Sequence, residues 1–177
     1  AGTFAVEPDI AWDKVTNTAF VIYSVFQNDS SFINMNTIVP PFLQADQTIY
    51  NIDSTGNALS PVVEFRHDSV FAVYSAINKV NGYANIKMKI LDDPALLLDS
   101  VFVSPAPRKQ SYPQMTLDDL RLPLISYYDS IDDNNVAMLS YYDEGGSNYR
   151  SDWMLWTAQR VAKRPEIVFV DTNHLYF

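Results

Sequence analysis

Pro61-Val62-Val63-Glu64-Phe65 and Pro113-Gln114-Met115-Thr116-Leu117 are two copies of one short pattern that decides the fold. The pattern occurs twice more, as Pro8-Asp9-Ile10-Ala11-Trp12 and as Pro165-Glu166-Ile167-Val168-Phe169. Successive prolines of this pattern are 53, 52 and 52 residues apart. A fixed period indicates a repeat protein, because each unit has apolar faces that only its neighbours can cover.

The register of the repeat continues beyond the prolines. A second apolar run follows each of them, as in Phe20-Val21-Ile22-Tyr23-Ser24 and Phe71-Ala72-Val73-Tyr74-Ser75. A third run carries a methionine and a fourth carries an aromatic residue, and we expect both to be buried between sheets rather than to hold a cofactor. These residues are Met35, Met88 and Met138, then Tyr50, Phe102 and Trp153. The four apolar runs therefore predict four short strands in each unit.

The composition favours an all-β chain. Hydrophobic residues make up 47% and aromatic residues 14% of the 177 residues, which excludes a disordered chain. The β-branched and aromatic residues occur in short runs bounded by Asn, Asp, Ser, Pro and Gly, which is typical of strands. No sustained apolar stripe of helical period is present, so we expect little helix.

Four antiparallel strands in each unit, with a proline at the start and Tyr-Ser at the end of the second run, resemble a blade of a β-propeller. Among propellers the pattern is similar to the sialidase-like (BNR-like) group, whose blades often open Pro-x-Ile/Val and continue with Val-x-Tyr/Trp-Ser. The Ser-x-Asp-x-Gly-x-Thr-Trp box of that group, the Asp-box, occurs in no unit. The group's substrate-binding arginines are missing too, because Arg66 corresponds to Asp13, Asp118 and Val170. No catalytic residue of the sialidases carries over.

The repeat predicts the domain organisation. We expect three blades at residues 8–60, 61–112 and 113–164, and the start of a fourth at 165–177, each opened by its proline. Residues 1–7 would be a linker or the end of a preceding blade. Because propellers close with typically about 4 to 8 blades, we expect a fragment of a larger propeller. More of the same chain, a second copy or a capping partner would supply the rest.

Alternation in the first strand of each unit predicts its buried residues. They are Ile10, Trp12, Val63, Phe65, Met115, Leu117, Ile167 and Phe169.

The turns at one end of the blades are the candidate ligand-binding surface. These turns join the second strand to the third, or one unit to the next, and they are polar. The candidate ligand-binding residues are Asn28, Asp29, Asn78, Asn81, Arg108, Asp132, Asp133 and Arg160. The alternative is that Asn, Asp and Gly occur there only because they form turns.

Metal and cofactor sites have little support in the sequence. The absence of cysteine excludes thiolate sites, and the two histidines, His67 and His174, are expected in exposed turns. Asp129, Asp132 and Asp133 form the one weak candidate, a calcium site, because calcium prefers several clustered oxygen ligands. Otherwise we expect no cofactor.

The net charge of −9 argues against nucleic acid and against an anionic membrane surface as partners. No apolar stretch reaches the ~18 residues of a membrane-spanning helix. With no nucleophile–base–acid set in view, we expect a non-catalytic binding or scaffolding propeller of a secreted or cell-surface protein. It would engage a protein or a glycan through its loop face.

Two other functions remain open. One is a glycan-processing enzyme, a hydrolase or lyase, with Glu64 and Asp132 as paired carboxylates. The other is a structural subunit of a larger assembly.

Overall fold

The computed structural model describes residues 3–40, 48–66, 68–91, 101–103, 106–118, 123–131, 134–143, 148–156, 167–171 and 174–176. All regular secondary structure in these residues is β-strand, and none of it is helix. Consequently no helix in the described part of the chain has the length and apolar character needed to cross a membrane.

The strands form four antiparallel sheets in chain order. The first sheet contains β1 (Phe4–Asp13), β2 (Thr18–Gln27), β3 (Ser30–Ile38) and β4 (Thr48–Asp53). The second contains β5 (Ala58–Arg66), β6 (Ser69–Ile77), β7 (Ala84–Leu91) and β8 (Val101–Phe102). The third contains β9 (Gln110–Leu117), β10 (Pro123–Ile131), β11 (Asn134–Asp143) and β12 (Asn148–Trp156). The last pair is β13 (Val168–Asp171) and β14 (His174–Tyr176).

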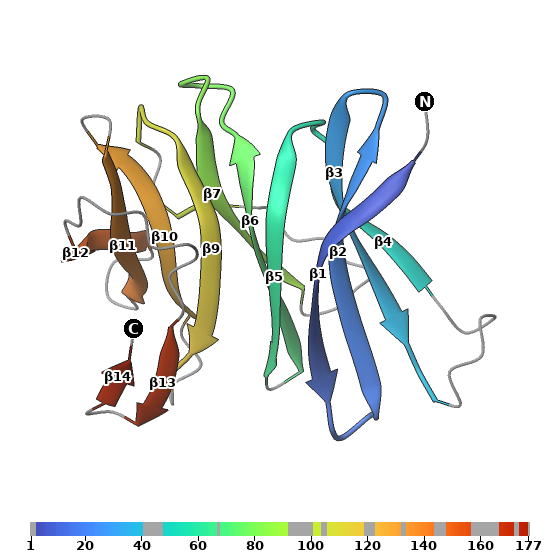
Figure 1. The fold of residues 1–177 in the computed structure, drawn as a ribbon. Helices are drawn as coiled ribbons and strands as arrows, with labels where there is room; N and C mark the ends of the chain where they lie inside the picture. Colours follow the sequence, from blue (N-terminus) through green and yellow to red (C-terminus); the bar gives the residue numbers. More distant parts are fainter. Residues whose placement is uncertain are drawn as a thin grey trace.

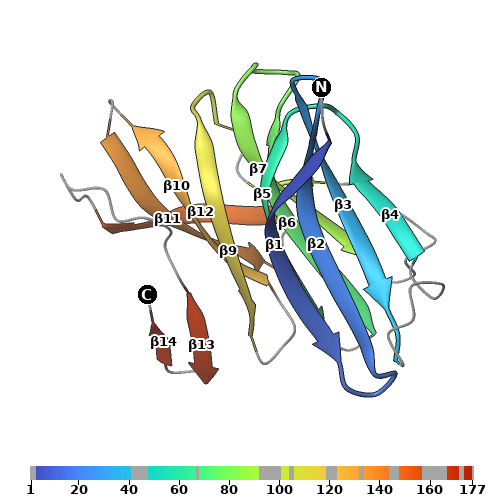
Figure 2. The ribbon, with the colours of Figure 1, turned by 45° about the vertical axis from the view of Figure 1, so that its right-hand side comes forward.

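The sheets stand side by side, and β1, β5 and β9 are neighbours along one line (Figure 1; Figure 2). The turns β1–β2 and β5–β6 lie at the lower end in Figure 1, and the turns β2–β3 and β6–β7 at the upper end. This arrangement confirms the predicted all-β fold of propeller-type blades, with three four-stranded blades and the start of a fourth.

The repeat prolines do not open their strands, contrary to the prediction. β1, β5 and β9 begin three or four residues before Pro8, Pro61 and Pro113. Phe4–Val6, predicted to lie in a linker or at the end of a preceding blade, pairs with Ser24–Phe26 of β2. The physical reason is that each strand continues through its proline by means of a bulge. The unit boundaries at residues 8, 61, 113 and 165 stay predictions.

Two apolar cores lie between successive sheets. The core between the first and second sheets includes Ile22, Met35 and Val63, and the core between the second and third includes Met88 and Met115. The predicted burial of the three repeat methionines is confirmed, because Met35, Met88 and Met138 are at most 8% exposed. Val63, Met115, Leu117 and Ile167 are also buried, and Phe65 packs partly buried against the first core. The side chain of Phe169 lies outside the described residues.

The predicted burial of Ile10 and Trp12 is wrong. Ile10 is 63% exposed and Trp12 40% exposed. Both side chains project from the face of β1 that is turned away from the second sheet. No described strand covers that face (Figure 2).

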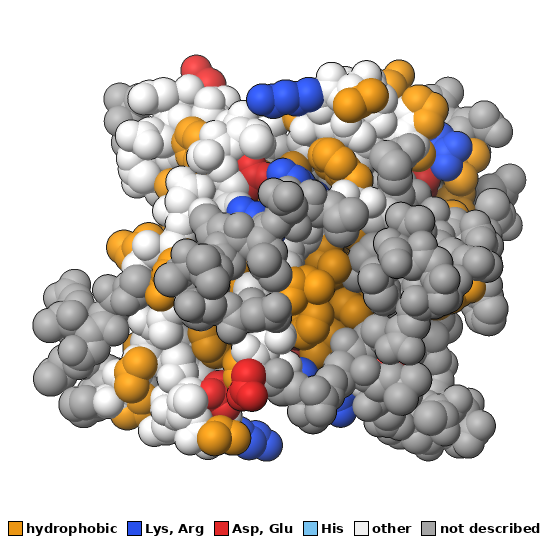
Figure 3. All heavy atoms as spheres, turned by 180° about the vertical axis from the view of Figure 1, so that it is seen from behind, with side chains coloured by type: hydrophobic (Ala, Val, Ile, Leu, Met, Phe, Trp, Pro, Cys, Tyr) orange, Lys and Arg blue, Asp and Glu red, His pale blue; other side chains and the backbone are white. Residues whose placement is uncertain are grey.

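Polar side chains tie the sheets together outside the cores. Lys87 of β7 forms an ion pair with Asp53 of β4 at 2.9 Å, so it joins the second sheet to the first. Arg66 donates to the carbonyl oxygens of Leu117 and Asp118 at 3.1 and 2.7 Å and joins the second sheet to the third. In the view from behind, the Lys and Arg side chains of the described residues are scattered rather than gathered into one patch (Figure 3).

Candidate functional site

The innermost strand of each four-stranded sheet carries the same irregularity. The β1–β2 register shifts between Val6 and Asp9, and the β5–β6 register shifts between Leu59 and Val62. In the third sheet the shift lies opposite Tyr112 and Pro113. Proline has no N–H to give to a ladder, and a bulge is a place where a strand tolerates it.

The residue before each of Pro8, Pro61 and Pro113 adopts a left-handed backbone conformation. The φ angles are 52° at Glu7, 54° at Ser60 and 52° at Tyr112. Positive φ is uncommon for residues other than glycine. Three matching values at repeat-equivalent positions therefore identify a feature of the fold rather than a local accident.

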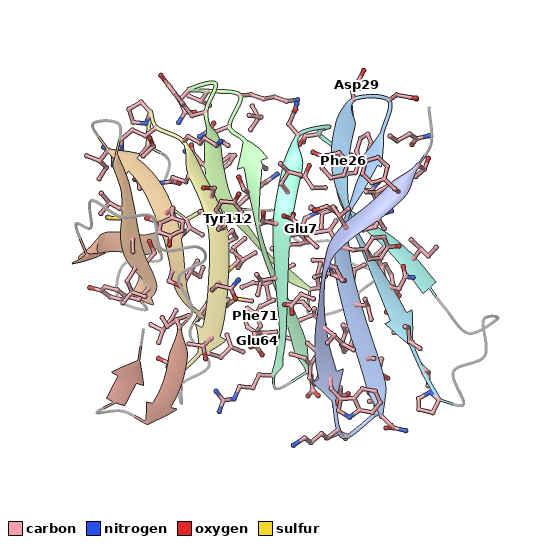
Figure 4. The ribbon with its side chains drawn as sticks, in the orientation of Figure 1. Glu7, Phe26, Asp29, Glu64, Phe71 and Tyr112 are labelled. Atoms are coloured by element: carbon pink, nitrogen blue, oxygen red, sulfur yellow. The ribbon has the colours of Figure 1, made fainter. Side chains whose placement is uncertain are left out.

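The three bulges surround one pocket, which we call the bulge pocket. It has a volume of about 210 Å³. Its lining residues are Glu7, Pro8, Asp9, Ser60, Pro61, Val62, Tyr112, Pro113 and Gln114. Figure 4 shows Glu7 and Tyr112 midway along the strands. The described residues that line the pocket provide two carboxylates, one hydroxyl, one amide and one phenol, and none of these described residues is lysine or arginine.

Both carboxylates of the bulge pocket accept hydrogen bonds from β5. Glu7 Oε2 accepts from the Ser60 backbone N–H at 2.8 Å, and Glu7 Oε1 accepts from Ser60 Oγ at 3.4 Å. Asp9 Oδ2 accepts from the Val63 backbone N–H at 2.8 Å. These contacts fix the carboxylates and also join the first sheet to the second.

Tyr112 gives the bulge pocket an aromatic surface. Its side chain is 44% exposed. Its ring packs edge-on against Tyr128, with the ring centroids 6.4 Å apart and the ring planes at 82°. One edge of the ring is therefore held in place, and part of its surface stays open to a ligand.

Glu64 lies on β5, two residues beyond the pocket-lining Val62 and nearer the lower turns (Figure 4). Burial raises the pKa of its half-buried carboxyl, the negative charge of Asp9 raises that pKa further, and the positive charge of Arg66 opposes the shift. Its predicted partner, Asp132, lies outside the described residues. Among the described carboxylates, Asp9 is the one whose charge acts on Glu64.

Asn28 and Asp29 form the exposed two-residue turn between β2 and β3, away from the bulge pocket (Figure 4). Their φ angles are 50° and 61°. A two-residue hairpin turn with positive φ at both positions favours Asn, Asp and Gly. The turn conformation alone thus accounts for these two residue types.

Asn78 and Asn81 are engaged in internal hydrogen bonds. Asn78 Nδ2 and Asn81 Nδ2 both donate to Oδ1 of the fully buried Asn85, at 3.1 and 2.9 Å. Asn81 Nδ2 also donates to the carbonyl oxygen of Ala106 at 2.8 Å. These amides therefore join the β6–β7 turn to the segment that leads into β9.

Arg108 forms an ion pair with Asp129. Arg108 donates from Nε and Nη2 to the two carboxylate oxygens of Asp129, at 2.9 and 3.0 Å. Gln110 Nε2 donates to the same carboxylate at 3.2 Å. Asp129 is 1% exposed, so both of its oxygens have partners inside the protein.

The remaining candidates cannot be placed. Asp132, Asp133, Arg160 and His67 lie outside the described residues, and only the backbone of His174 is described. Among the residues that are described, no three His, Cys, Asp or Glu side chains are grouped so that they could hold a metal ion. The calcium site stays a prediction.

Sequence reasoning missed Glu7, Asp9 and Tyr112. The usable signal was a proline inside each alternating run, because proline within a strand indicates a bulge, and bulges occur next to active sites.

The sequence matches no protein-family model and no curated protein. The fold, however, is similar to several solved structures. A thermostable family-43 glycoside hydrolase has a TM-score of 0.60 at 12% identity, over 86% of this chain and 52% of its own. An N-acetylgalactosamine deacetylase from F. plautii, solved in complex with blood group B trisaccharide, has a TM-score of 0.57 at 10% identity, over 84% and 52%.

A family 117 glycoside hydrolase produced by the marine bacterium Zobellia galactanivorans has a TM-score of 0.52 at 15% identity, over 85% of this chain and 46% of its own. This chain thus spans about half the length of these proteins. At such identities the likeness shows the fold, which is of the β-propeller type.

Proposed function

We propose that this propeller processes a glycan that binds in the bulge pocket. The observation that carries the proposal is the pocket itself, in which three equivalent bulges place Glu7, Asp9 and the exposed Tyr112 around one cavity. Glycoside hydrolysis uses two carboxylates. An exposed aromatic ring offers an apolar surface with a polar tip, which suits a sugar ring. The similar solved structures are those of glycan-acting enzymes, which supports the proposal that the ligand is a glycan.

The two pocket carboxylates differ in how many of their oxygens accept hydrogen bonds from described residues. Glu7 uses both oxygens to accept hydrogen bonds from Ser60. Asp9 accepts through Oδ2, and no donor among the described residues bonds to its Oδ1. We assign Asp9 the contact with the reacting water or sugar. Glu64 does not line the pocket, so we assign it no contact with the sugar; burial and the charge of Asp9 raise its pKa.

The size of the pocket limits the part of the glycan that enters it. Its volume of about 210 Å³ is below the roughly 300–1,000 Å³ of pockets for drug-sized ligands. We therefore propose that one sugar unit enters and that the rest of the glycan lies outside. The described lining residues offer no cation for a sugar carboxylate, so we propose that the sugar is neutral.

The second candidate is glycan binding without chemistry, in a secreted or cell-surface protein. One observation favours it. Glu7 and Asp9 both accept backbone N–H groups of β5, so the need to join two sheets already explains these carboxylates. In this case Tyr112 would bind sugar and no bond would break.

The test compares turnover with binding on a panel of neutral polysaccharides. Release of reducing ends measures hydrolysis, and retardation in polysaccharide-containing native gels measures binding. We expect Asp9→Asn to reduce turnover by about 10²- to 10⁴-fold, the usual contribution of acid–base catalysis. We expect Tyr112→Ala to weaken binding by about 2- to 10-fold, from the ~0.5–1.5 kcal/mol of an aromatic contact.

The matched control is Asp29→Asn, which removes a carboxylate from an exposed turn outside the pocket. It should leave both measurements at the wild-type value. Binding without turnover would select the second candidate. If Asp29→Asn lowers binding while Tyr112→Ala does not, the ligand binds at the loop face and the bulge pocket is wrong.

A further inference from the structure

Two phenylalanine rings are stacked at the upper end of the first sheet. Phe4 of β1 and Phe26 of β2 are opposite one another in register, so they share a face of the sheet. Their ring centroids are 5.2 Å apart and their ring planes meet at 7°, which is a parallel stack. We call these two rings the phenylalanine stack.

The phenylalanine stack adjoins the bulge pocket through one side chain of β2. Ser24 Oγ donates to the pocket carboxylate, Glu7 Oε2, at 3.5 Å. Side chains two residues apart on a strand point to the same face and lie about 6.5 Å apart. Phe26 follows Ser24 at this spacing, and Figure 4 shows it on the side of Glu7 nearer the β2–β3 turn. The stack is therefore the next side-chain position beyond the pocket wall.

Burial in the first core does not account for the phenylalanine stack. Among the described residues, the partly buried hydrophobic side chains that pack against that core are Tyr50 and Phe65. Phe4 is instead 57% exposed. Because Phe26 covers one side of the Phe4 ring, this exposure falls on the other side and on the ring edge. The stack thus presents a flat apolar surface next to the pocket.

We propose that the phenylalanine stack is a second sugar-binding position, which holds the units of a neutral oligosaccharide that adjoin the unit in the bulge pocket. This inference rests on the proposed function, because the pocket must hold a sugar first. A pocket of about 210 Å³ leaves the rest of the glycan outside, on a neighbouring surface. A neutral sugar ring has an apolar C–H face, which packs on a flat aromatic ring.

The stacking also prepares Phe4 for binding. A ring that Phe26 already holds in one orientation loses little side-chain freedom when a sugar packs on it. Phenylalanine has no polar atom, so this position would select for the flat face of a sugar rather than for a particular hydroxyl group. Specificity would then come from the bulge pocket, and the stack would add affinity for longer ligands.

The test is NMR titration with a length series from the monosaccharide to the hexasaccharide, prepared from the neutral polysaccharide that the protein binds best. All variants carry Asp9→Asn, so the sugar is not cleaved. Phe4→Ala should weaken hexasaccharide binding by about 2- to 10-fold and leave monosaccharide binding unchanged. Tyr112→Ala should weaken both. Phe4→Leu, apolar without a flat ring, should behave as Phe4→Ala, whereas Phe4→Tyr should bind as the parent does.

Trp12→Ala is the matched control, because Trp12 is an aromatic residue of the same strand that is 40% exposed on the far side of the bulge. It should bind every length as the parent does. An effect of Tyr112→Ala without any effect of Phe4→Ala overturns this inference and leaves the proposed function standing. Full hexasaccharide affinity in Phe4→Leu, or equal losses for both lengths in Phe4→Ala, also overturns it. A parent that binds no sugar overturns the proposed function and this inference together.

Discussion

The Glu7 carboxylate accepts a hydrogen bond from the Ser60 backbone N–H at 2.8 Å, across 53 residues of sequence. Both residues precede a repeat proline and have the same left-handed conformation. The bulge of one sheet is thus bound directly to the bulge of the next. The wall of the bulge pocket is consequently also an inter-sheet contact, and changes there affect stability as well as ligand binding.

Glu7→Ala should lower the free energy of unfolding by about 1–3 kcal/mol, because the partly buried Ser60 N–H loses its acceptor. Glu7→Gln keeps an amide oxygen at that place and should cost less than about 1 kcal/mol. Urea unfolding of the two variants beside the wild type measures the difference. Equal losses would show that the hydrogen bond to Ser60 does not contribute.

Lys87→Met should destabilise the protein by about 3–5 kcal/mol, because it leaves a buried carboxylate unpaired. The side chains of Lys87 and Asp53 are 14% and 1% exposed. Burial acts to raise the pKa of Asp53, but hydrogen bonds from Thr55 and Lys87 together lower it below 3.8. The resulting stabilisation is present above that ordinary value and is lost as pH falls through the lowered pKa of the folded state.

Lys79→Met is the control for Lys87→Met, because Lys79 lies in an exposed turn. Thermal unfolding at neutral pH should separate the two variants clearly. Adding Asp53→Asn to Lys87→Met should recover part of the loss, since the buried charge is then gone. A double variant no more stable than Lys87→Met would contradict this account of the pair.

Because of Glu64, the free energy of unfolding should fall as pH rises above 4.5, the ordinary pKa of this carboxyl. Burial and the charge of Asp9 raise its pKa in the folded state, so the folded protein holds more protons between the two pKa values. The difference in unfolding free energy between the wild type and Glu64→Gln isolates this effect. Asp9→Asn removes a like charge and should lower the pKa of Glu64, which NMR titration of its carboxyl carbon measures directly. An unchanged value would mean that Asp9 does not act on Glu64.

Asn81→Ala should lower stability by about 1–2 kcal/mol through lost hydrogen bonds, yet leave glycan affinity unchanged. Its amide donates to Asn85 and Ala106, and its Oδ1 accepts from the Tyr83 N–H at 2.9 Å. Urea unfolding and native-gel retardation supply the two readouts. Weaker glycan binding at unchanged stability would instead support the predicted role of Asn81 in ligand binding.

The sequence carried enough information for the blades because their signal is periodic. Met35, Met88 and Met138 repeat in register and are buried in the structure. β10 begins at Pro123, which pairs with Leu117, and the first pair of a strand is a place where proline is tolerated. The repeat period and the turn-forming residues at the ends of each apolar run therefore predicted the sheets, because both follow from local chemistry.

Burial at the first sheet and the candidate site depend on neighbours that a local pattern does not encode. Ile10 and Val63 occupy the same position in the same pattern, but only Val63 has a preceding sheet over it. Likewise Glu7, Ser60 and Tyr112 share a backbone conformation but no side-chain chemistry. No alignment of side-chain types could have joined these three residues into one pocket.

The left-handed position before each proline accepts a carboxylate, a hydroxyl and a phenol on nearly the same backbone, with φ between 52° and 54°. Side-chain identity at this position is therefore separable from strand geometry. Tyr112 can be exchanged, as in Tyr112→His, without removing the Glu7–Ser60 hydrogen bonds that join the first two sheets. Each of the three described bulges thus supplies one side chain of a different chemical type to the wall of a common cavity.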